Sequence, residues 1–364
     1  MKVLVQLNHP AHYHLYKNLI RILKDKGHDV LVTSRNKDVL EDLLSGTSHI
    51  TLKSTRGKTL LQKIKQYSIK TKELMKIVDE FLPDITVGTA AELSVITRKK
   101  GIPSIFLAED DANLNLPIFL VALTCYPFFS EIITPQVCYN SIWDKGSIKY
   151  NGYQKLAYLH PNYFTPDRNI IAKYLPVDKP YFIIRLSELN AYHDIGVKGI
   201  SSEILIKLIA KLEKHGDIYI SAEGKLDPQF EHFKIKINPS DMHHFLAFAS
   251  IYMGDSQSMA IEAAMLGTPS IRFNDFVGKI SVLEELEHKY ELTTGIKSSD
   301  PEGLYKKIDS ILALPDIKEE FQAKRRKMLS DKIDLTAFMV WFVENYPQSK
   351  KIMKQNPDYQ YNFR

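Results

Sequence analysis

Hydrophobic and polar positions follow two different periods along the first half of the chain. Short apolar runs such as KVLVQL (residues 2–7) and DVLVT (residues 29–33) have the length and composition of buried strands. Between these two runs, apolar residues recur every three or four positions over residues 15–26 and stop at Gly27, which predicts an amphipathic helix. Further strand-like runs cover residues 84–88, 103–109, 130–135 and 147–152. Strands that alternate with helices predict a parallel sheet covered on both faces.

The second half of the chain repeats this alternation. Residues 160–180 separate the halves, contain four prolines and lack a strong pattern, so we place a linker there. We predict a Rossmann-like domain over residues 1–160 and a second Rossmann-like domain over residues 161–334. Residues 335–364 predict a helix and a basic, unpatterned tail, which we expect to pack on the first domain. The predicted strands of the second half cover residues 180–187, 217–224, 250–256 and 268–274, and its predicted helices cover residues 200–216, 241–249 and 258–267.

Length and composition fit a soluble protein of two domains. The chain has 364 residues, of which 44% are hydrophobic and 25% are charged. No apolar run approaches the roughly 20 residues that cross a bilayer. Cys125 and Cys138 provide neither a disulfide framework nor a metal-binding spacing. A net charge of +5 is mild for this length and does not indicate nucleic-acid binding. We expect a cytoplasmic protein that contains no metal.

Positive charge is concentrated in one segment, residues 53–76. This segment has eight lysines or arginines and one glutamate, with apolar residues interleaved at helical spacing. One interpretation is a surface helix whose apolar stripe packs on its own domain. The other is peripheral contact with the inner face of an anionic membrane, or with an acceptor that carries phosphate.

The most informative segment for function is the turn from a strand into a helix at Gly254. The residues that open this helix are Asp255, Ser256, Gln257 and Ser258. The first turn of a helix presents unpaired N–H groups and the positive end of the helix dipole, which suit a phosphate. Glu262 lies one turn beyond Ser258, where its carboxylate can accept both hydroxyls of a ribose. A simple helix cap with a solvated Glu262 is the alternative, but the small residues along this helix favour tight packing beneath a site.

The same segment carries a family resemblance. Residues 254–269, GDSQSMAIEAAMLGTP, resemble the nucleotide-sugar motif of GT-B proteins. UDP-N-acetylglucosamine 2-epimerases have an Asp-Ser-Gly-Gly run followed by Glu here, and GT-B glycosyltransferases have a Glu ahead of Gly-x-Pro. Residues 7–35 are similar to the first strand, loop and helix of this superfamily. The resemblance runs nearly end to end and is closest to an uncharacterised bacterial and archaeal family found in surface-polysaccharide contexts.

The resemblance implies an α/β fold of two doubly wound, Rossmann-like domains that face each other across a cleft. The first domain would lie on the acceptor side and the second would bind the nucleotide sugar. Ser256, Gln257 and Ser258 would hold the diphosphate, and Glu262 would hold the ribose.

The first predicted loop is rich in histidine, with His9, His12 and His14 close to Asn8. Loops at the carboxyl end of a strand often carry catalytic residues, and histidine titrates near neutral pH. His12 best matches the position where GT-B transferases place a histidine, so we predict it to be catalytic. At least one of the other histidines is expected to cap the following helix. No matching acidic or cysteine ligands indicate a metal.

A run of acids, Glu109, Asp110 and Asp111, follows the fourth predicted strand. Adjacent acids repel each other, which raises a pKa and creates a proton donor, so we add Glu109 and Asp110 to the predicted catalytic residues. Glu109 also coincides with a catalytic Glu in the epimerases. Thr89, however, stands where those epimerases carry an Asp.

Three further segments lie at carboxyl ends of strands or beside them in the second domain. Arg185 and Ser187 follow its first strand, and a guanidinium suits a diphosphate because it contacts two phosphate oxygens at once. Glu223 follows the next strand, and His243 lies where GT-B proteins often recognise the base. We include these four residues in the predicted nucleotide-sugar site. Weaker candidates are Asn190, His193, Asp194, Ser221 and His244.

The function predicted from the sequence is a glycosyltransferase that moves a sugar from a nucleotide diphosphate to a hydroxyl group. We expect UDP as the nucleotide, a glycan or lipid-linked acceptor, and a role in surface polysaccharide or glycoconjugate biosynthesis. The chain has no Asp-x-Asp motif, so we expect neither a divalent metal nor another cofactor. Two alternatives are a UDP-N-acetylglucosamine 2-epimerase or its hydrolysing relative, and a non-catalytic protein that binds nucleotide sugars.

Overall fold

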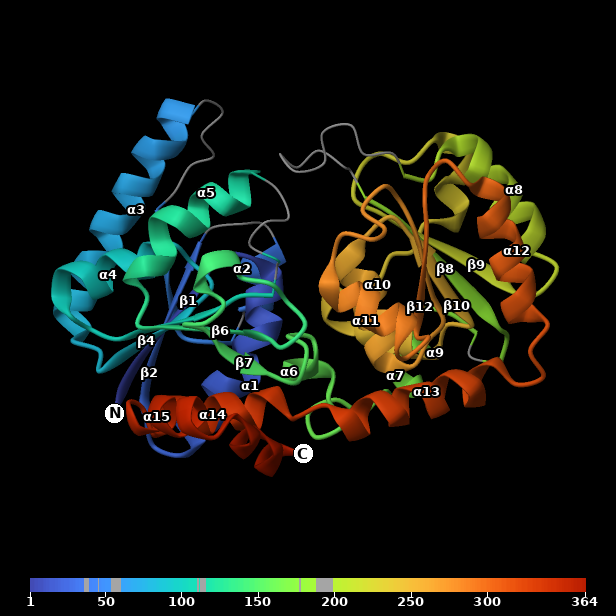
Figure 1. Cartoon of the computed structure of the whole chain (residues 1–364). Helices are drawn as coiled ribbons and strands as arrows, with labels where there is room; N and C mark the ends of the chain where they lie inside the picture. Colours follow the sequence, from blue (N-terminus) through green and yellow to red (C-terminus); the bar gives the residue numbers. More distant parts are fainter. Residues whose placement is uncertain are drawn as a thin grey trace. The chain divides into compact units, whose positions relative to one another are not determined.

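A computed structural model of the chain describes residues 1–35, 39–44, 46–53, 60–109, 111, 116–176, 178–187 and 199–364. The chain forms two compact units. Unit 1 contains Met1–Tyr158 and Lys332–Arg364, and unit 2 contains Leu159–Asp331. Each unit has a central sheet flanked by helices (Figure 1). The chain therefore leaves unit 1 after residue 158 and returns to it at residue 332.

Unit 1 is built on a parallel sheet of seven strands in the order β3-β2-β1-β4-β5-β6-β7. Strand β1 lies between its partners, with Val3 opposite Val30 of β2 and Ile85 of β4. Most strand residues are buried because helices cover both faces of such a sheet. Their bounds are β1 (Lys2–Leu7), β2 (Asp29–Arg35), β3 (His49–Leu52), β4 (Ile85–Gly88), β5 (Ser104–Leu107), β6 (Glu131–Pro135) and β7 (Ile148–Tyr150).

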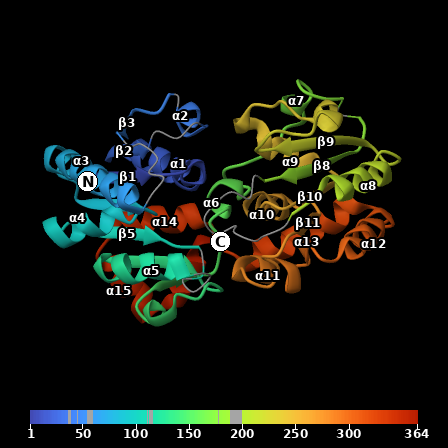
Figure 2. The same cartoon turned by 90° about the horizontal axis from the view of Figure 1, so that it is seen from above.

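Three helices of unit 1 cover the same face of its sheet. A buried cluster joins Leu4 of β1 with Leu74 of α3, Leu93 of α4 and Cys125 of α5. In Figure 2 these three helices lie beside one another along the sheet. The helices of the N-terminal part of the unit are α1 (Pro10–Asp25), α2 (Val39–Leu43), α3 (Leu60–Phe81), α4 (Glu92–Lys100), α5 (Leu116–Cys125), the 3₁₀ helices η1 (Tyr126–Phe128) and η2 (Ser141–Trp143), and α6 (Leu156–Leu159), which ends at the first residue of unit 2.

The C-terminal segment completes unit 1 with α14 (Leu335–Glu344), α15 (Gln348–Gln355) and the 3₁₀ helix η5 (Pro357–Phe363). The prediction of an unpatterned tail after the helix was wrong. The Asn151 N–H donates to Gln360 Oε1 (2.6 Å), and the Asp334 N–H donates to the Phe363 carbonyl (2.6 Å). The rings of Trp341 and Tyr359 stack with their centroids 4.8 Å apart. The sequence pattern missed these helices because both are short and are held by such contacts rather than by a long apolar stripe.

Helix α14 also carries an ionic contact to the turn between α1 and β2. Glu344 accepts hydrogen bonds from Lys26 Nζ (2.7 Å) and interacts with His28 Nε2 (2.9 Å). Partial burial raises the pKa of the Glu344 carboxyl, but the opposing effects of Lys26 and His28 are larger, so the net pKa lies below its ordinary value. The return of the chain to unit 1 is therefore reinforced by a charge interaction.

Unit 2 contains a parallel sheet of five strands in the order β12-β11-β10-β8-β9. Strand β10 lies between β8 and β11, with Gly254 opposite Arg185 and Arg272. The strands are β8 (Tyr181–Leu186), β9 (Asp217–Ala222), β10 (Ile251–Gly254), β11 (Ser270–Phe273) and β12 (Thr293–Ile296). The helices are α7 (Arg168–Ile171), α8 (Ser202–Leu212), η3 (Pro228–Phe233), η4 (Pro239–Asp241), α9 (Met242–Phe248), α10 (Gln257–Leu266), α11 (Ser281–His288), α12 (Pro301–Leu312) and α13 (Ile317–Asp331).

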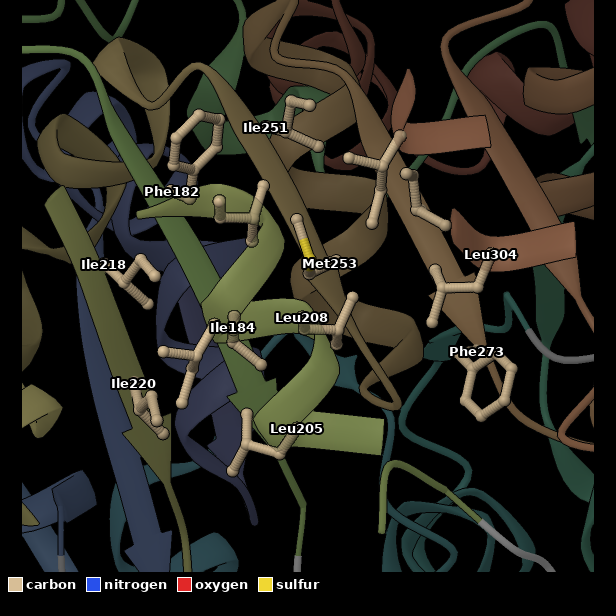
Figure 3. Close-up of a cluster of buried hydrophobic side chains, with 14 of the residues drawn as sticks. Phe182, Ile184, Leu205, Leu208, Ile218, Ile220, Ile251, Met253, Phe273 and Leu304 are labelled. Carbon is tan, nitrogen blue, oxygen red and sulfur yellow. The ribbon is translucent and has the colours of Figure 1, made fainter. Parts of the chain in front are cut away.

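The core of unit 2 forms where α8 and α12 pack on one face of this sheet. Ile184 of β8 and Met253 of β10 are fully buried there against Leu208 of α8 and Leu304 of α12 (Figure 3). These side chains fix the strands and therefore the positions of the carboxyl ends of β8, β9 and β10.

The structure confirms the predicted fold class, an α/β protein with two parallel, Rossmann-like sheets. Strands β3 and β12 were not predicted, because each is only partly buried and their sequences, HITL and TTGI, lack a continuous apolar run. Helix α1 begins at Pro10 rather than at Leu15, since His9 caps it and proline is well tolerated in a first turn. Among the described residues no helix is long and apolar enough to span a membrane.

Candidate functional site

The turn between β10 and α10 in unit 2 depends on a glycine. A Cβ at Gly254 would lie 2.6 Å from the Arg185 carbonyl oxygen, so a side chain there would collide with the neighbouring strand. Asp255 follows, 5% exposed, and its carboxylate accepts a hydrogen bond from the Ser187 N–H (2.7 Å). Burial raises the pKa of the Asp255 carboxyl, and the hydrogen bonds from Ser187 oppose this effect only in part. Asp255 therefore ties the loop after β8 to the loop after β10.

Helix α10 opens toward the carboxyl end of the sheet with its first N–H groups unpaired, as at every helix start. Ser256 is the N-cap, and its hydroxyl accepts a long hydrogen bond from the Met259 N–H (3.5 Å). Both polar atoms of the Gln257 side-chain amide are buried without a hydrogen-bond partner. Ser258 is exposed at the next position. A buried amide with no partner is costly, so this turn is suited to a ligand that supplies polar atoms.

Arg185 connects the ends of β8 and β9. Its Nη1 donates to Ser221 Oγ (2.7 Å), and its Nη2 forms an ion pair with Glu223. Its Nε is buried and has no partner. The structure thus brings together three residues that the sequence placed at these strand ends. Nη2 of the guanidinium already pairs with Glu223, whereas Nε remains a donor without a hydrogen-bond partner.

Glu262 and His243 lie next to each other in unit 2. Glu262 Oε1 is 3.3 Å from His243 Nε2, and their side chains are 15% and 6% exposed. Phe164 contacts the His243 ring edge-on, and the Asp167 N–H donates to Nδ1 of the following histidine, His244 (3.0 Å). The sequence predicted separate contacts to ribose and base for Glu262 and His243, whereas the structure makes them partners. Asn190, His193 and Asp194 lie outside the described residues.

A second polar cluster lies in unit 1, around His12. The prediction that His12 lies in a loop was wrong, since it belongs to the first turn of α1. The Asn8 N–H donates to His12 Nδ1 (3.1 Å), and Thr89 Oγ1 lies 2.8 Å from both ring nitrogens. Because Nδ1 accepts a hydrogen bond, the neutral ring carries its proton on Nε2. His9 caps α1 by accepting from the Ala11 N–H (3.2 Å), as expected for one histidine of this segment.

The acids after β5 have separate partners. Glu109 accepts a hydrogen bond from the Gln154 N–H (2.7 Å) and forms an ion pair with Lys155 Nζ (3.0 Å). Asp111 accepts from the Tyr139 N–H (2.7 Å). Glu109 is therefore engaged in an ion pair within unit 1, which differs from the proton donor that adjacent acids suggested. Asp110 lies outside the described residues.

Sequence reasoning missed a buried ion pair beside His12. Lys70 of α3 lies 2.7 Å from Glu92 of α4, and their side chains are 12% and 4% exposed. Asn8 Nδ2 lies 3.5 Å from the same carboxylate. Burial raises the pKa of the neighbouring Tyr67 to about 12, with smaller contributions from Cys125 and from Glu92. The sequence feature that could have indicated this ion pair is the position of Glu92, which follows the carboxyl end of β4 in the segment GTAAEL.

No metal site accompanies these clusters in the described part of the chain, where no group of three His, Cys, Asp or Glu side chains is placed to hold an ion. The two clusters share one position in the fold. Both lie where parallel strands end and helices begin, the edge at which open α/β sheets bind ligands.

The two parallel, Rossmann-like sheets give the chain a fold of the GT-B type, and solved structures match this architecture. The spinosyn rhamnosyltransferase SpnG, complexed with thymidine diphosphate, is 13% identical with a TM-score of 0.62, over 95% of this chain and 100% of that one. The UDP-GlcNAc 2-epimerase from Neisseria meningitidis, bound to UDP-GlcNAc, is 14% identical with a TM-score of 0.63, over 91% of this chain and 95% of that one. The calicheamicin glycosyltransferase CalG4 is 12% identical with a TM-score of 0.57, over 95% of this chain and 99% of that one.

The chain belongs to the family described as "Protein of unknown function (DUF354)", whose model matches residues 1–341. No curated protein matches the sequence. At these identities the solved structures establish the fold alone, so the chemistry has to be inferred from the site.

Proposed function

We propose that the protein is a glycosyltransferase that transfers a sugar from a nucleotide diphosphate, with UDP favoured, to a hydroxyl group of a glycan or lipid-linked acceptor. The reaction would serve surface polysaccharide or glycoconjugate biosynthesis in the cytoplasm. One structural neighbour is complexed with thymidine diphosphate and another is bound to UDP-GlcNAc, which supports this class of substrate.

The observation that carries the proposal is the opening turn of α10. Gly254 allows the turn, the N–H groups of the first helical turn point at the site, and the Gln257 amide is buried without a partner. A diphosphate would accept from these donors and from Arg185 Nε. Glu262, one turn further along α10, would accept the ribose hydroxyls. The same donors would stabilise the charge that develops on the leaving diphosphate.

In unit 1 we assign His12 to the acceptor hydroxyl. With the proton on Nε2, His12 donates a hydrogen bond to the acceptor oxygen. His12 can act as a base only if the hydrogen bond from the Asn8 N–H to Nδ1 is broken, because Nδ1 is then able to take up a proton. Two substitutions separate these roles. His12→Ala should abolish turnover and leave UDP affinity near normal. His12→Gln, which keeps an N–H donor, should retain part of the turnover if donation suffices and none if a base is required.

Incubation with UDP-N-acetylglucosamine tests the reaction. Turnover that requires an added hydroxyl acceptor supports transfer. Release of UDP together with an epimerised or free sugar, without any acceptor, supports the epimerase instead. Binding with no turnover under either condition would identify a protein that only binds nucleotide sugars, and failure to bind any nucleoside diphosphate would contradict the whole proposal.

The epimerase is the second candidate because solved epimerase structures share the fold and Glu109 occupies the position expected for a catalytic acid. Two observations weigh against it. Thr89, in place of an acid, contacts His12, and Glu109 is held by Lys155.

The proposed mechanism uses helix N–H groups and Arg185 for the diphosphate, so it requires no divalent cation. A chelator should therefore leave the transfer rate unchanged. A rate that falls with chelator and recovers with magnesium would show that the diphosphate is neutralised by a metal.

A further inference from the structure

The helices α3, α4 and α5 cover the same face of the sheet in unit 1. The inner faces of these helices share a buried cluster that includes Leu74, Leu93 and Cys125. The Tyr67 hydroxyl of α3 interacts with the Ser94 hydroxyl of α4, and buried side chains of all three helices belong to the same hydrophobic cluster. Figure 2 shows them side by side. Their solvent-facing side chains can therefore act together.

The solvent-facing side of α3 is basic. Lys65, Ile69, Lys72 and Lys76 recur at three- and four-residue spacing, and all four are exposed, with Ile69 at 40%. Among the described residues these three lysines form no ion pair. The buried side of the helix instead carries Lys70, which is paired. The structure supports the first interpretation of this helix, since its apolar stripe packs on unit 1, and its outer face presents positive charge.

The solvent-facing side of α5 is apolar. Leu120 and Leu123, one turn apart, are 50% and 47% exposed. Phe128 of η1 follows at 36% exposed, with the Arg98 guanidinium of α4 over its ring at 4.9 Å. The next residue of α4, Lys99, is also exposed. Large exposed aliphatic side chains on one helix face mark an interaction surface rather than a solvated one.

We propose that this surface, defined by the lysines of the outer face of α3 and the leucines of α5, docks on an anionic lipid bilayer. The leucines would enter the boundary between headgroups and acyl chains, and the lysines would contact the headgroups. The contact is peripheral and does not depend on the reaction catalysed.

The possible binding partners of this surface can be distinguished by their charge. A second copy of the chain using the same surface would bring like charges together, which disfavours a symmetric dimer. A nucleic acid would engage the lysines, but the exposed leucines would add nothing to phosphate binding. A bilayer with acidic headgroups is complementary to both parts of the surface.

Vesicle co-sedimentation tests the proposal with full-length protein. Binding to phosphatidylglycerol-containing vesicles should exceed binding to pure phosphatidylcholine vesicles and should weaken as salt is raised. Replacing Lys65, Lys72 and Lys76 by alanine should reduce partitioning about a hundredfold, because each lysine near an anionic surface contributes about fivefold. The variant Leu120→Asp/Leu123→Asp should reduce it at least about tenfold.

Unit 2 offers matched controls. Ile206 on α8 is also 50% exposed, and Lys214, Lys225 and Lys236 are exposed lysines of that unit. Ile206→Asp and the triple alanine variant of these lysines should leave vesicle binding unchanged. Thermal melts of all variants confirm folding.

Four results would overturn the proposal. The first is equal binding to neutral and acidic vesicles. The second is an equal loss of binding in the unit 2 controls, which would show that only net charge matters. The third is a dimer in light scattering that Leu120→Asp dissolves, which would assign the surface to a second copy. Inorganic phosphate that competes as well as vesicles do would likewise contradict lipid docking.

Discussion

Glu262 provides the sharpest test of the nucleotide site, because its predicted partner on the ligand can also be changed. Its carboxylate would accept hydrogen bonds from both ribose hydroxyls, and hydrogen bonds to a charged group contribute about 1.5–3 kcal/mol each in favourable cases. His243 already contacts this carboxylate at 3.3 Å, so part of that interaction exists without ligand. We therefore expect Glu262→Ala to weaken UDP binding by about 1–3 kcal/mol, which is about 5- to 150-fold in Kd.

Isothermal titration with UDP and with 2′-deoxy-UDP completes the test. The native protein should prefer UDP, and Glu262→Ala should bind both nucleotides with equal affinity, since the group that distinguishes them is gone. Glu285→Ala is the matched control, because Glu285 lies on α11 of the same unit and its side chain is likewise 15% exposed. Unchanged UDP affinity in Glu262→Ala, or a preference for UDP that persists in this variant, would refute the assignment.

Three further predictions concern stability and the geometry of the turn. Lys70→Met leaves the Glu92 carboxylate buried without its partner and should cost about 3–5 kcal/mol in urea unfolding, whereas a conservative arginine should cost less. Gly254→Ala places a Cβ 2.6 Å from the Arg185 carbonyl oxygen and should lower unfolding free energy by about 1–3 kcal/mol and weaken UDP binding. The pKa of the Glu344 carboxyl is lowered in the folded protein. Its contribution to the free energy of unfolding is therefore present above the ordinary carboxyl pKa and is lost as the pH falls through the lowered value. Glu344→Gln should therefore lower the melting temperature at neutral pH and change it little in acid.

The elements that could be predicted are those whose buried residues form a recognisable apolar pattern in the sequence. Strand β1 was predicted with its observed bounds, because all of Val3, Leu4, Val5 and Leu7 are fully buried. Strands β3 and β12 are only partly buried and have no continuous apolar run, so they left too little pattern to recognise. The short C-terminal helices depend on contacts such as Gln360 with the Asn151 N–H, which no local pattern reveals.

For the site, residues next to each other in sequence were easier to predict than pairs made by the fold. The turn at Gly254 and the opening of α10 were predictable because strand, glycine and helix follow in order. The pairing of Glu262 with His243, and of Lys70 with Glu92, joins different helices and therefore could not be predicted. The roles of these residues in binding and catalysis stay predictions.

The assembly of unit 1 from two separate stretches of chain has a consequence for biosynthesis. On the ribosome, the segment up to Tyr158 emerges first, yet its fold is completed by Lys332–Arg364, which is made after all of unit 2. Domains usually fold in the order in which they are synthesised. Here the half that begins first has to wait for the other half, so truncation of the chain before Lys332 would damage unit 1 even though all of Met1–Tyr158 is present.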